Sequence, residues 1–282
     1  MKLSKRIIPK LDIKGENLVK GINLEGLRVL GKPEVFASNY YKNGADELIF
    51  QDIISSLYGI KTLQNVIKKT ASEIFIPLTI GGGINSTNDI YDLLRCGADK
   101  VSINSAAIKN PNLIKKAIKL FGSSTIVASI ETQLIENKYY AFTESGRNKS
   151  NKELIPWIQE LQDLGVGEIT ITFIDSEGTG KGIDLKLVES ISKFLSVPII
   201  LNGGIGNKNH AFDLLSINKI SGLAISSMFH YDRIKNYKIT DEDYPLGNID
   251  FLLNNKSNFN FETISIIDLK KFLLSKKIEI NI

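Results

Sequence analysis

Short apolar segments with strand character alternate with helix-periodic segments along most of the chain. Between the apolar segments, hydrophobic residues recur at helical spacing, as Ile90, Leu93 and Leu94 do. Strands that alternate with helices indicate a parallel sheet, and eight strands close a barrel. The sequence therefore predicts a single (β/α)8 TIM barrel of the α/β class. The eight predicted strands cover residues 6–13, 47–52, 76–80, 100–104, 124–130, 168–174, 197–201 and 222–226.

The second half of the chain repeats the first at an offset of about 121 positions. Prolines, glycines, small polar residues and acids all recur in the same order, which chance would rarely produce. A repeat of this kind indicates a duplicated structural unit, so we predict two fused half-barrels. The matched pairs are Asp12 with Glu131, Pro77 with Pro198, Gly82 with Gly203, Gly83 with Gly204, Asn104 with Ser226, and Ser105 with Ser227.

Residues 232–264 interrupt this pattern and precede a last predicted helix near 266–274. The stretch contains polar runs such as 254–258, which are too hydrophilic to form core. A loop of this length is usually either functional or poorly ordered, and the sequence leaves both open. We predict one domain over residues 1–282 with an insert at 232–264.

Composition narrows the class of protein. The 282 residues suit an α/β barrel, which needs about 250. A net charge of +4 suits small anionic substrates, and no dense basic run points to nucleic acid. No apolar stretch approaches the roughly 20 residues of a membrane span, residues 1–6 show no signal-peptide core, and Cys96 is the single cysteine. We therefore expect a cytoplasmic protein without disulfides.

Two glycine-containing motifs are candidate phosphate sites. In barrels of this kind the loops that follow the strands form the active-site face, and phosphates commonly bind after strands seven and eight. We define the second cradle as Gly203–Gly206 with Ser226 and Ser227, and the first cradle as its repeat, Gly81–Gly83 with Asn104 and Ser105. Glycines also make tight turns, but two repeated cradles predict an elongated substrate with a phosphate at each end.

Two acids lie at the carboxyl ends of opposite predicted strands, Asp12 and Glu131. Paired carboxylates across a barrel mouth suit general acid–base catalysis; the alternative is that each caps a strand or pairs with a lysine. Lys10 falls on the same strand face as Asp12. Asp175, at the end of the sixth strand, is a plausible third polar group. The two histidines, His210 and His230, have no third ligand at a suitable spacing, so we expect no metal and no cofactor.

A further set of motifs runs along the chain: 6–9, 19–21, 44–48, 77–84, 98–107 and 121–123, with Gly178, Thr179, Phe229 and His230. These motifs closely resemble the cyclase subunit of imidazole glycerol phosphate synthase. The run from Ala98 to Ala107 is quite specific, whereas the glycine motifs are shared with the sister isomerase of the histidine pathway. The resemblance covers about residues 5–231 and resumes weakly in the last helix.

The resemblance implies a lyase of histidine biosynthesis. Such enzymes use ammonia from a glutaminase partner to cleave and cyclise a bisphosphorylated ribulosyl formimino carboxamide nucleotide. The products are imidazole glycerol phosphate and an aminoimidazole carboxamide ribotide. The family's catalytic acids fall on Asp12 and Glu131, and the lysine of its mobile first loop falls on Lys20. Its phosphate contacts fall on Gly83, Asn104, Ser105, Gly178, Gly204, Ser226 and Ser227.

The family admits ammonia at the barrel's N-terminal face, where the resemblance implies that a glutaminase docks as a heterodimer. Two acids and two bases would line the entry, but the same four residues could form an inert salt-bridged plug, because buried charges must be paired. The chain shows no glutaminase nucleophile of its own. The four gate residues are Arg6, Glu47, Lys100 and Glu168.

Four residues depart from the family pattern near the predicted site. Lys10 replaces a small residue, Glu131 an aspartate, Phe173 a small hydroxyl residue, and Glu177 an aspartate. These departures leave other functions open beside the cyclase. One is a paralogue that passes ammonia to another acceptor, such as a surface-glycan sugar. Others are a non-catalytic scaffold that activates a glutaminase and the sister isomerase.

Overall fold

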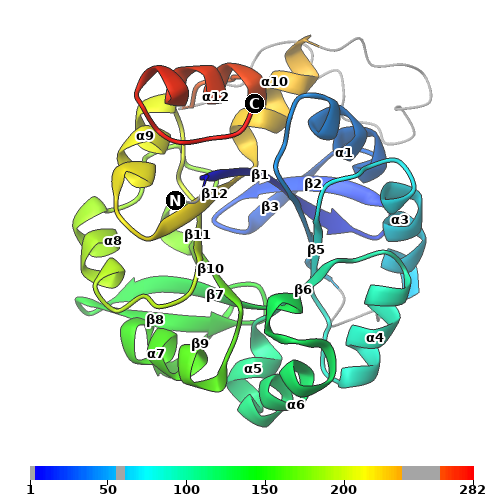
Figure 1. Cartoon of the computed structure of the whole chain (residues 1–282), viewed down its shortest axis with the longest axis vertical. Coiled ribbons are helices and arrows are strands. Elements are labelled where there is room, and N and C mark those ends of the chain that lie inside the picture. Colours follow the sequence, from blue (N-terminus) through cyan, green and yellow to red (C-terminus); the bar gives the residue numbers. More distant parts are fainter. Residues whose placement is uncertain (1–3, 55–60, 237–260) are drawn as a thin grey trace.

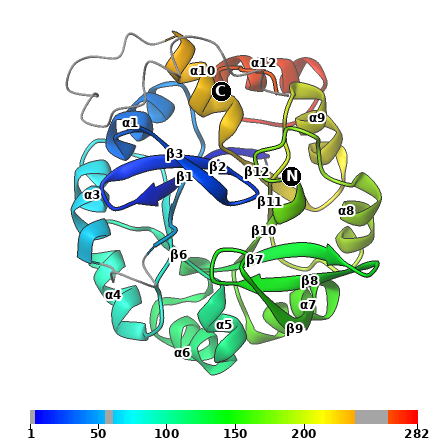
Figure 2. The same cartoon turned by 180° about the vertical axis from the view of Figure 1, so that it is seen from behind.

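A computed structural model describes residues 4–54, 61–236 and 261–282. Eight parallel strands form a closed ring, because β10 pairs both with β11 and with β7. Figures 1 and 2 show the barrel end-on from its two sides, with helices around it. All eight predicted strands are present, so the predicted TIM barrel is confirmed. In ring order the strands are β1 (Arg6–Lys14), β4 (Leu48–Asp52), β5 (Leu78–Gly81), β6 (Lys100–Ile103), β7 (Ile126–Ile135), β10 (Glu168–Phe173), β11 (Ile199–Asn202) and β12 (Ile220–Ile225).

The helices pack their apolar stripes against the outside of the strands. In α4, Ile90 and Leu93 are buried, and Ser86 with Asp89 forms a capping box that fixes the helix start. The α-helices are α1 (Pro33–Lys42), α3 (Lys61–Ala71), α4 (Thr87–Arg95), α5 (Ser105–Lys109), α6 (Pro111–Phe121), α7 (Leu154–Leu164), α8 (Leu185–Ser192), α9 (Lys208–Ser216), α10 (Ser227–Asn236) and α12 (Ile266–Ser275), with 3-10 turns η1 (Ser123–Thr125) and η2 (Ile174–Ser176). Within the described ranges, no helix is long and apolar enough to cross a membrane.

Two antiparallel hairpins, which the sequence pattern did not predict, extend the barrel at equivalent places. The first is β2 (Asn17–Ile22) with β3 (Glu25–Gly31), joined to β1, and the second is β8 (Lys138–Thr143) with β9 (Asn148–Glu153), joined to β7. Strands β2 and β8 begin 121 positions apart, which matches the sequence repeat. Figure 2 shows both hairpins on the same side of the barrel. The hairpins therefore extend the two-fold repeat to the loops over the barrel mouth.

The interruption near the C-terminus begins later than the sequence pattern predicted. Helix α10 continues to Asn236, so the first residues of the predicted insert are helical. Residues 237–260 lie outside the described ranges. From Phe261 the chain lies against the loop after β11, where the Glu262 N–H donates to the Gly206 carbonyl at 2.7 Å. The described end of the insert is therefore next to the second cradle.

Candidate active site

Lys10 and Asp12 project from the same face of β1 and form a buried ion pair. Successive residues of a strand alternate between faces, so these two side chains lie side by side. Lys10 Nζ lies 2.8 Å from Asp12 Oδ1, and the two residues are only 6% and 3% exposed. Burial opposes the charged form of Lys10, but Asp12 and then Glu177 outweigh it and raise the lysine pKa. Asp12 therefore has a lysine ammonium as its direct partner.

Glu131, on β7, has neutral hydrogen-bond donors instead of a cation. Its Oε2 accepts from the Gly146 N–H at 2.8 Å and from the Asn104 side-chain amide at 3.1 Å. Burial raises the pKa of Glu131 to about 7, although Lys10 and these two donors favour the charged form. The predicted acid pair thus consists of two carboxylates in unlike environments, the arrangement that acid–base catalysis requires.

The first cradle opens into a cavity of about 130 Å³. Gly83, Asn104 and Ser105 line this cavity together with Glu131, whereas Asp12 is not part of its lining. Gly82 has a φ of +106°, and a Cβ there would lie 2.2 Å from the Asp52 carbonyl oxygen, so the turn requires glycine. The cradle is continuous with the acid on β7.

The second cradle is assembled but nearly filled. Gly178, Gly204, Ser226 and Ser227 line one cavity of about 20 Å³, and Phe261, from the end of the predicted insert, is also part of its lining. Such a volume holds about one water molecule. The Ser226 hydroxyl donates to the Lys10 carbonyl at 2.8 Å, which ties this cradle to β1. The sequence predicted the glycines and serines; it gave no signal for Phe261.

Lys20 and Asp175 lie outside the linings of both cavities. Lys20 is buried on β2, and its Nζ lies 2.6 Å from Glu177 Oε1. Asp175 is exposed and accepts a hydrogen bond from the Leu134 N–H at 3.0 Å. Lys20 is therefore separated from the second cavity by Glu177, which is part of its lining, whereas Asp175 is bonded to the backbone of β7.

Three of the four residues that depart from the family pattern have a specific side-chain partner. Lys10 pairs with Asp12 and Glu177 pairs with Lys20, while the Phe173 ring packs edge-on against Tyr139 of β8 at 6.3 Å. The fourth, Glu131, is held by the Gly146 N–H and the Asn104 amide.

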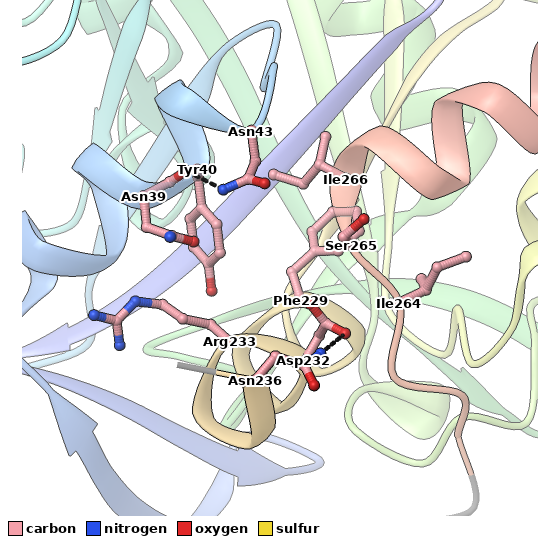
Figure 3. A pocket seen from close by; sticks show the side chains of 10 residues that line it. All are labelled: Asn39, Tyr40, Asn43, Phe229, Asp232, Arg233, Asn236, Ile264, Ser265 and Ile266. Atoms are coloured by element: carbon pink, nitrogen blue, oxygen red, sulfur yellow. Dashed lines mark hydrogen bonds between the residues drawn. The ribbon is translucent and has the colours of Figure 1, made fainter. Parts of the chain in front are cut away.

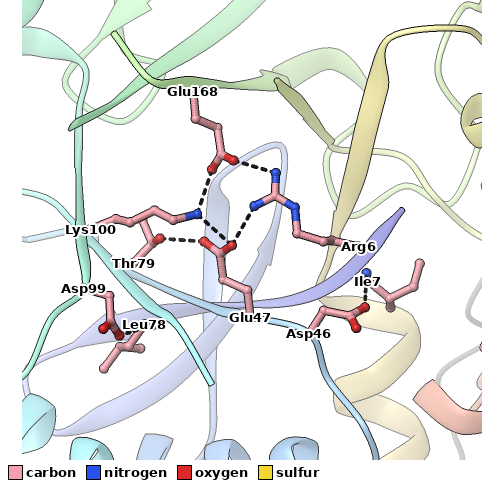
Figure 4. A network of polar contacts seen from close by, with 9 residues as sticks. All are labelled: Arg6, Ile7, Asp46, Glu47, Leu78, Thr79, Asp99, Lys100 and Glu168. Atoms are coloured by element: carbon pink, nitrogen blue, oxygen red, sulfur yellow. Dashed lines mark hydrogen bonds and ion pairs between the residues drawn. The ribbon is translucent and has the colours of Figure 1, made fainter. Parts of the chain in front are cut away.

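At the opposite end of the barrel, the four predicted gate residues form a closed ring of ion pairs (Figure 4). Arg6 contacts Glu47 at 2.8 Å and Glu168 at 2.5 Å, and Lys100 contacts the same two acids at 2.8 and 3.3 Å. Thr79 donates a further hydrogen bond to Glu47 at 2.7 Å. The ring lies at the N-terminal ends of β1, β4, β6 and β10. Its outer side borders a hollow of about 1020 Å³ on the N-terminal face, lined by Arg6, Lys100 and Glu168 among others.

A further pocket of about 220 Å³ lies between α1, α10 and α12 (Figure 3). Its polar side chains are bonded within the wall: the Asn236 amide donates to Asp232 at 2.8 Å and the Asn43 amide to the Asn39 carbonyl at 2.8 Å. Behind it, His230 stacks on Tyr40, whose hydroxyl lies 2.6 Å from the ring Nδ1. Burial lowers the His230 pKa to about 3, so the ring is neutral. Among the described residues no cluster of three metal-ligating side chains occurs.

The fold is a (β/α)8 barrel with one acid on β1 and one on β7, Asp12 and Glu131. Residues 6–235 match the family model described as "Histidine biosynthesis protein". The chain is 49% identical over 202 residues to the imidazole glycerol phosphate synthase subunit HisF of Legionella pneumophila, covering 71% of this chain and 95% of that protein. It is 46% identical over 230 residues to HisF of Bacillus cereus strain AH187, covering 81% and 91%. The chain belongs to this histidine biosynthesis family of HisF cyclase subunits, which confirms the expected resemblance.

Proposed function

We propose that this chain is an ammonia-dependent cyclase that produces imidazole glycerol phosphate and an aminoimidazole carboxamide ribotide. The carrying observation is the pair of carboxylates in unlike environments: Glu131 lines the cavity of the first cradle, and the buried Asp12 pairs with Lys10, whose carbonyl binds Ser226 of the second cradle. A bisphosphorylated substrate would span the mouth with one phosphate in each cradle. In that pose its central atoms lie over the acid pair. We assign the reaction to the cytoplasm, in keeping with the free thiol of Cys96.

The acid pair would move protons during cleavage and ring closure. With a pKa of about 7, Glu131 can carry a proton at neutral pH and donate it to the leaving group. Asp12, paired with Lys10, is suited to accept one. Ammonia supplies the nitrogen, and no metal or cofactor is required by this scheme.

The cradles would hold phosphate through backbone N–H groups and hydroxyls, in the way that such loops bind anions elsewhere. Lys20 would reach the substrate only after its ion pair with Glu177 opens, and Asp175 only after it leaves Leu134. We propose these two as contacts of a rearranged, substrate-bound mouth. The phosphate contacts that we propose are Gly83, Asn104, Ser105, Gly178, Gly204, Ser226 and Ser227.

A glutaminase subunit would supply the ammonia from the N-terminal face. The hollow there borders Arg6, Lys100 and Glu168, so a docked partner would face the ion-pair ring directly. Because the ring is closed, ammonia could pass only when at least one ion pair opens. We propose that the Arg6, Glu47, Lys100 and Glu168 ring is the gate of that passage.

The test is a nitrogen-source experiment on the purified chain. It should convert the bisphosphorylated nucleotide with ammonium salts and not with glutamine, and should gain glutamine-dependent turnover when its cognate glutaminase is added. Turnover of glutamine by the chain alone would contradict the partnership. If the chain activates the glutaminase but converts no substrate with either nitrogen source, the scaffold function is correct instead.

The alternative of an acceptor with only one tightly held phosphate is left for an experiment to exclude, because the HisF relatives support the cyclase. The first cradle has about 130 Å³ of space and the second about 20 Å³. A surface-glycan sugar precursor is an acceptor of this kind. Phosphate titration distinguishes the two: occupancy of both cradles at saturation supports the cyclase, and occupancy of the first alone supports the other acceptor.

A further inference from the structure

Lys10 lies among the charged groups of the barrel mouth, yet makes direct contact with only one of the two acids. Its Nζ is 2.8 Å from Asp12 Oδ1. Glu131 has no such contact; its Oε2 is bonded to the Gly146 N–H and the Asn104 amide. The titratable groups that act on this cluster come from five elements: Lys10 and Asp12 on β1, Lys20 on β2, Glu131 on β7, Glu177 after η2 and His230 on α10.

A buried lysine in this position has a specific electrostatic effect. Two carboxylates that share a buried site would otherwise compete for one proton, and their titrations would belong to the pair as a whole. A cation in contact with one of them breaks that equivalence, since attraction falls with distance. The contacted acid stays ionised, and the other becomes the site where a proton is bound.

We propose that Lys10 is a positioning residue that holds Asp12 as the ionised base and leaves Glu131 as the acid that carries the proton. The proposal rests on the cyclase function for the two roles, but the charge arrangement itself belongs to the free protein. Lys10 acts through Asp12 and needs no contact with substrate. Its replacement should therefore change the pH dependence of the reaction, which loss of packing alone would not do.

The matched variants are Lys10→Met, which removes the charge at similar size, and Lys10→Arg, which keeps it. In the wild type, turnover should need Asp12 ionised and Glu131 protonated, with an alkaline limb near the Glu131 pKa of about 7. In Lys10→Met the acidic limb should move up by about 1–3 pH units, the usual effect of an opposite charge in contact. The alkaline limb should move up less, because Lys10 acts on Glu131 without contact. Lys10→Arg should restore limbs close to those of the wild type.

The second readout is the titration of the Asp12 and Glu131 carboxyl carbons by NMR in the substrate-free chain. It should show the same shifts as the pH profile. If these shifts occur but the wild type converts no nucleotide, the cyclase function fails and the charge division stands. If the nucleotide is converted but Lys10→Met changes neither the pH profile of turnover nor the NMR titration of the two carboxyl groups, the proposal is overturned.

Lys10→Met leaves Asp12 buried without a partner and could prevent folding. The double variant Lys10→Met/Asp12→Asn removes both charges and avoids this. Lys10 favours the charged form of Glu131 and Asp12 opposes it less strongly, so the loss of Asp12 offsets part of the loss of Lys10. The pKa of Glu131 should then rise by less in the double variant than in Lys10→Met. A rise of the Glu131 pKa by the roughly 1–3 units that loss of a direct ion pair causes would contradict the proposal that Lys10 acts mainly on Asp12.

Discussion

The two halves of the barrel share a backbone plan but differ in what fills it. In the first half, the cradle after β5 and β6 opens into a cavity of about 130 Å³, and the acid of this half, Asp12, pairs with a lysine. In the second half, the cavity after β11 and β12 is about 20 Å³, and the acid of this half, Glu131, has neutral donors and lines the cavity of the first cradle. Duplication thus supplies two equivalent frames, while a few side chains make them chemically unequal. The proposed division into one acid and one base depends on that inequality.

The largest effect is expected when the acid of either half is replaced. Glu131→Gln and Asp12→Asn should each lower turnover by roughly 10²–10⁴, the usual contribution of a positioned acid or base. The Michaelis constant should change little, because the cradles supply most of the binding. Steady-state kinetics with saturating ammonium measures both values.

Asp163→Asn, at an exposed position of α7, is the control and should keep wild-type turnover. Asp12→Asn also leaves Lys10 buried without its partner, so its folding must be checked by circular dichroism. Wild-type turnover in Glu131→Gln would show that the second half contributes no catalytic acid.

The cradles are compared by matched glycine substitutions. Gly82→Ala and Gly203→Ala place a Cβ at φ +106° and +98°, and 2.2 and 2.6 Å from the carbonyl oxygens of Asp52 and Phe173. Each should lower the free energy of unfolding by more than Gly44→Ala, where φ is +80° but no heavy atom lies within 4 Å. Gly44→Ala therefore measures only the cost of a positive φ in a residue with a Cβ, about 1–2 kcal/mol. Urea unfolding measures the excess.

Phosphate binding by the same three variants refines the result. If both cradles bind phosphate, Gly82→Ala and Gly203→Ala should each lose one site by NMR titration. If only Gly82→Ala loses binding, the second cradle does not bind phosphate in the free protein. Gly44→Ala should bind as the wild type does.

Sequence pattern predicted the barrel because each barrel strand is a short, nearly continuous apolar run. It missed the second hairpin because β9, Asn148–Glu153, is polar throughout and gains its place from pairing with β8. The contact of Lys10 with Asp12 follows from strand periodicity, whereas the bond from Gly146 to Glu131 depends on a turn whose position periodicity does not give.

Contacts between residues far apart in the sequence also could not be predicted at the site. Lys20 and Asp175 have the chemistry of substrate contacts, but their partners Glu177 and Leu134 are distant in sequence. Phe261 belongs to a stretch that looked like a polar insert, and only the fold brings it to the second cradle. Residue type and spacing predicted which residues belong to the candidate site. Tertiary contacts decide which of those side chains line the cavities of the two cradles.

The unlike environments of the two acids also predict a pH dependence of stability. The pKa of Glu131 rises from 4.5 in the unfolded chain to about 7 in the folded chain. The contribution of Glu131 to the free energy of unfolding is therefore fully present below pH 4.5 and is lost as the pH rises through 7. The expected loss is roughly 1–3 kcal/mol, since one unit is worth 1.36 kcal/mol and the open cavity screens part of it. Urea unfolding between pH 4.5 and 8 should show this loss in the wild type. The pH dependence should be shallower in Glu131→Gln, and equal slopes would contradict the raised pKa.

The smallest expected effect comes from opening the second cradle with Phe261→Ala. The ring lies 5.4 Å from the Tyr231 ring, a contact worth about 0.5–1.5 kcal/mol, so stability should fall only slightly. Removal of the ring enlarges a cavity that now holds about one water, so inorganic phosphate should bind there severalfold more tightly by NMR titration. Phe194→Ala, at a residue 44% exposed after α8, is the control and should leave phosphate binding unchanged. If Phe261→Ala weakens phosphate binding instead, the ring is part of the binding site, and the two cradles differ in their walls rather than in their access.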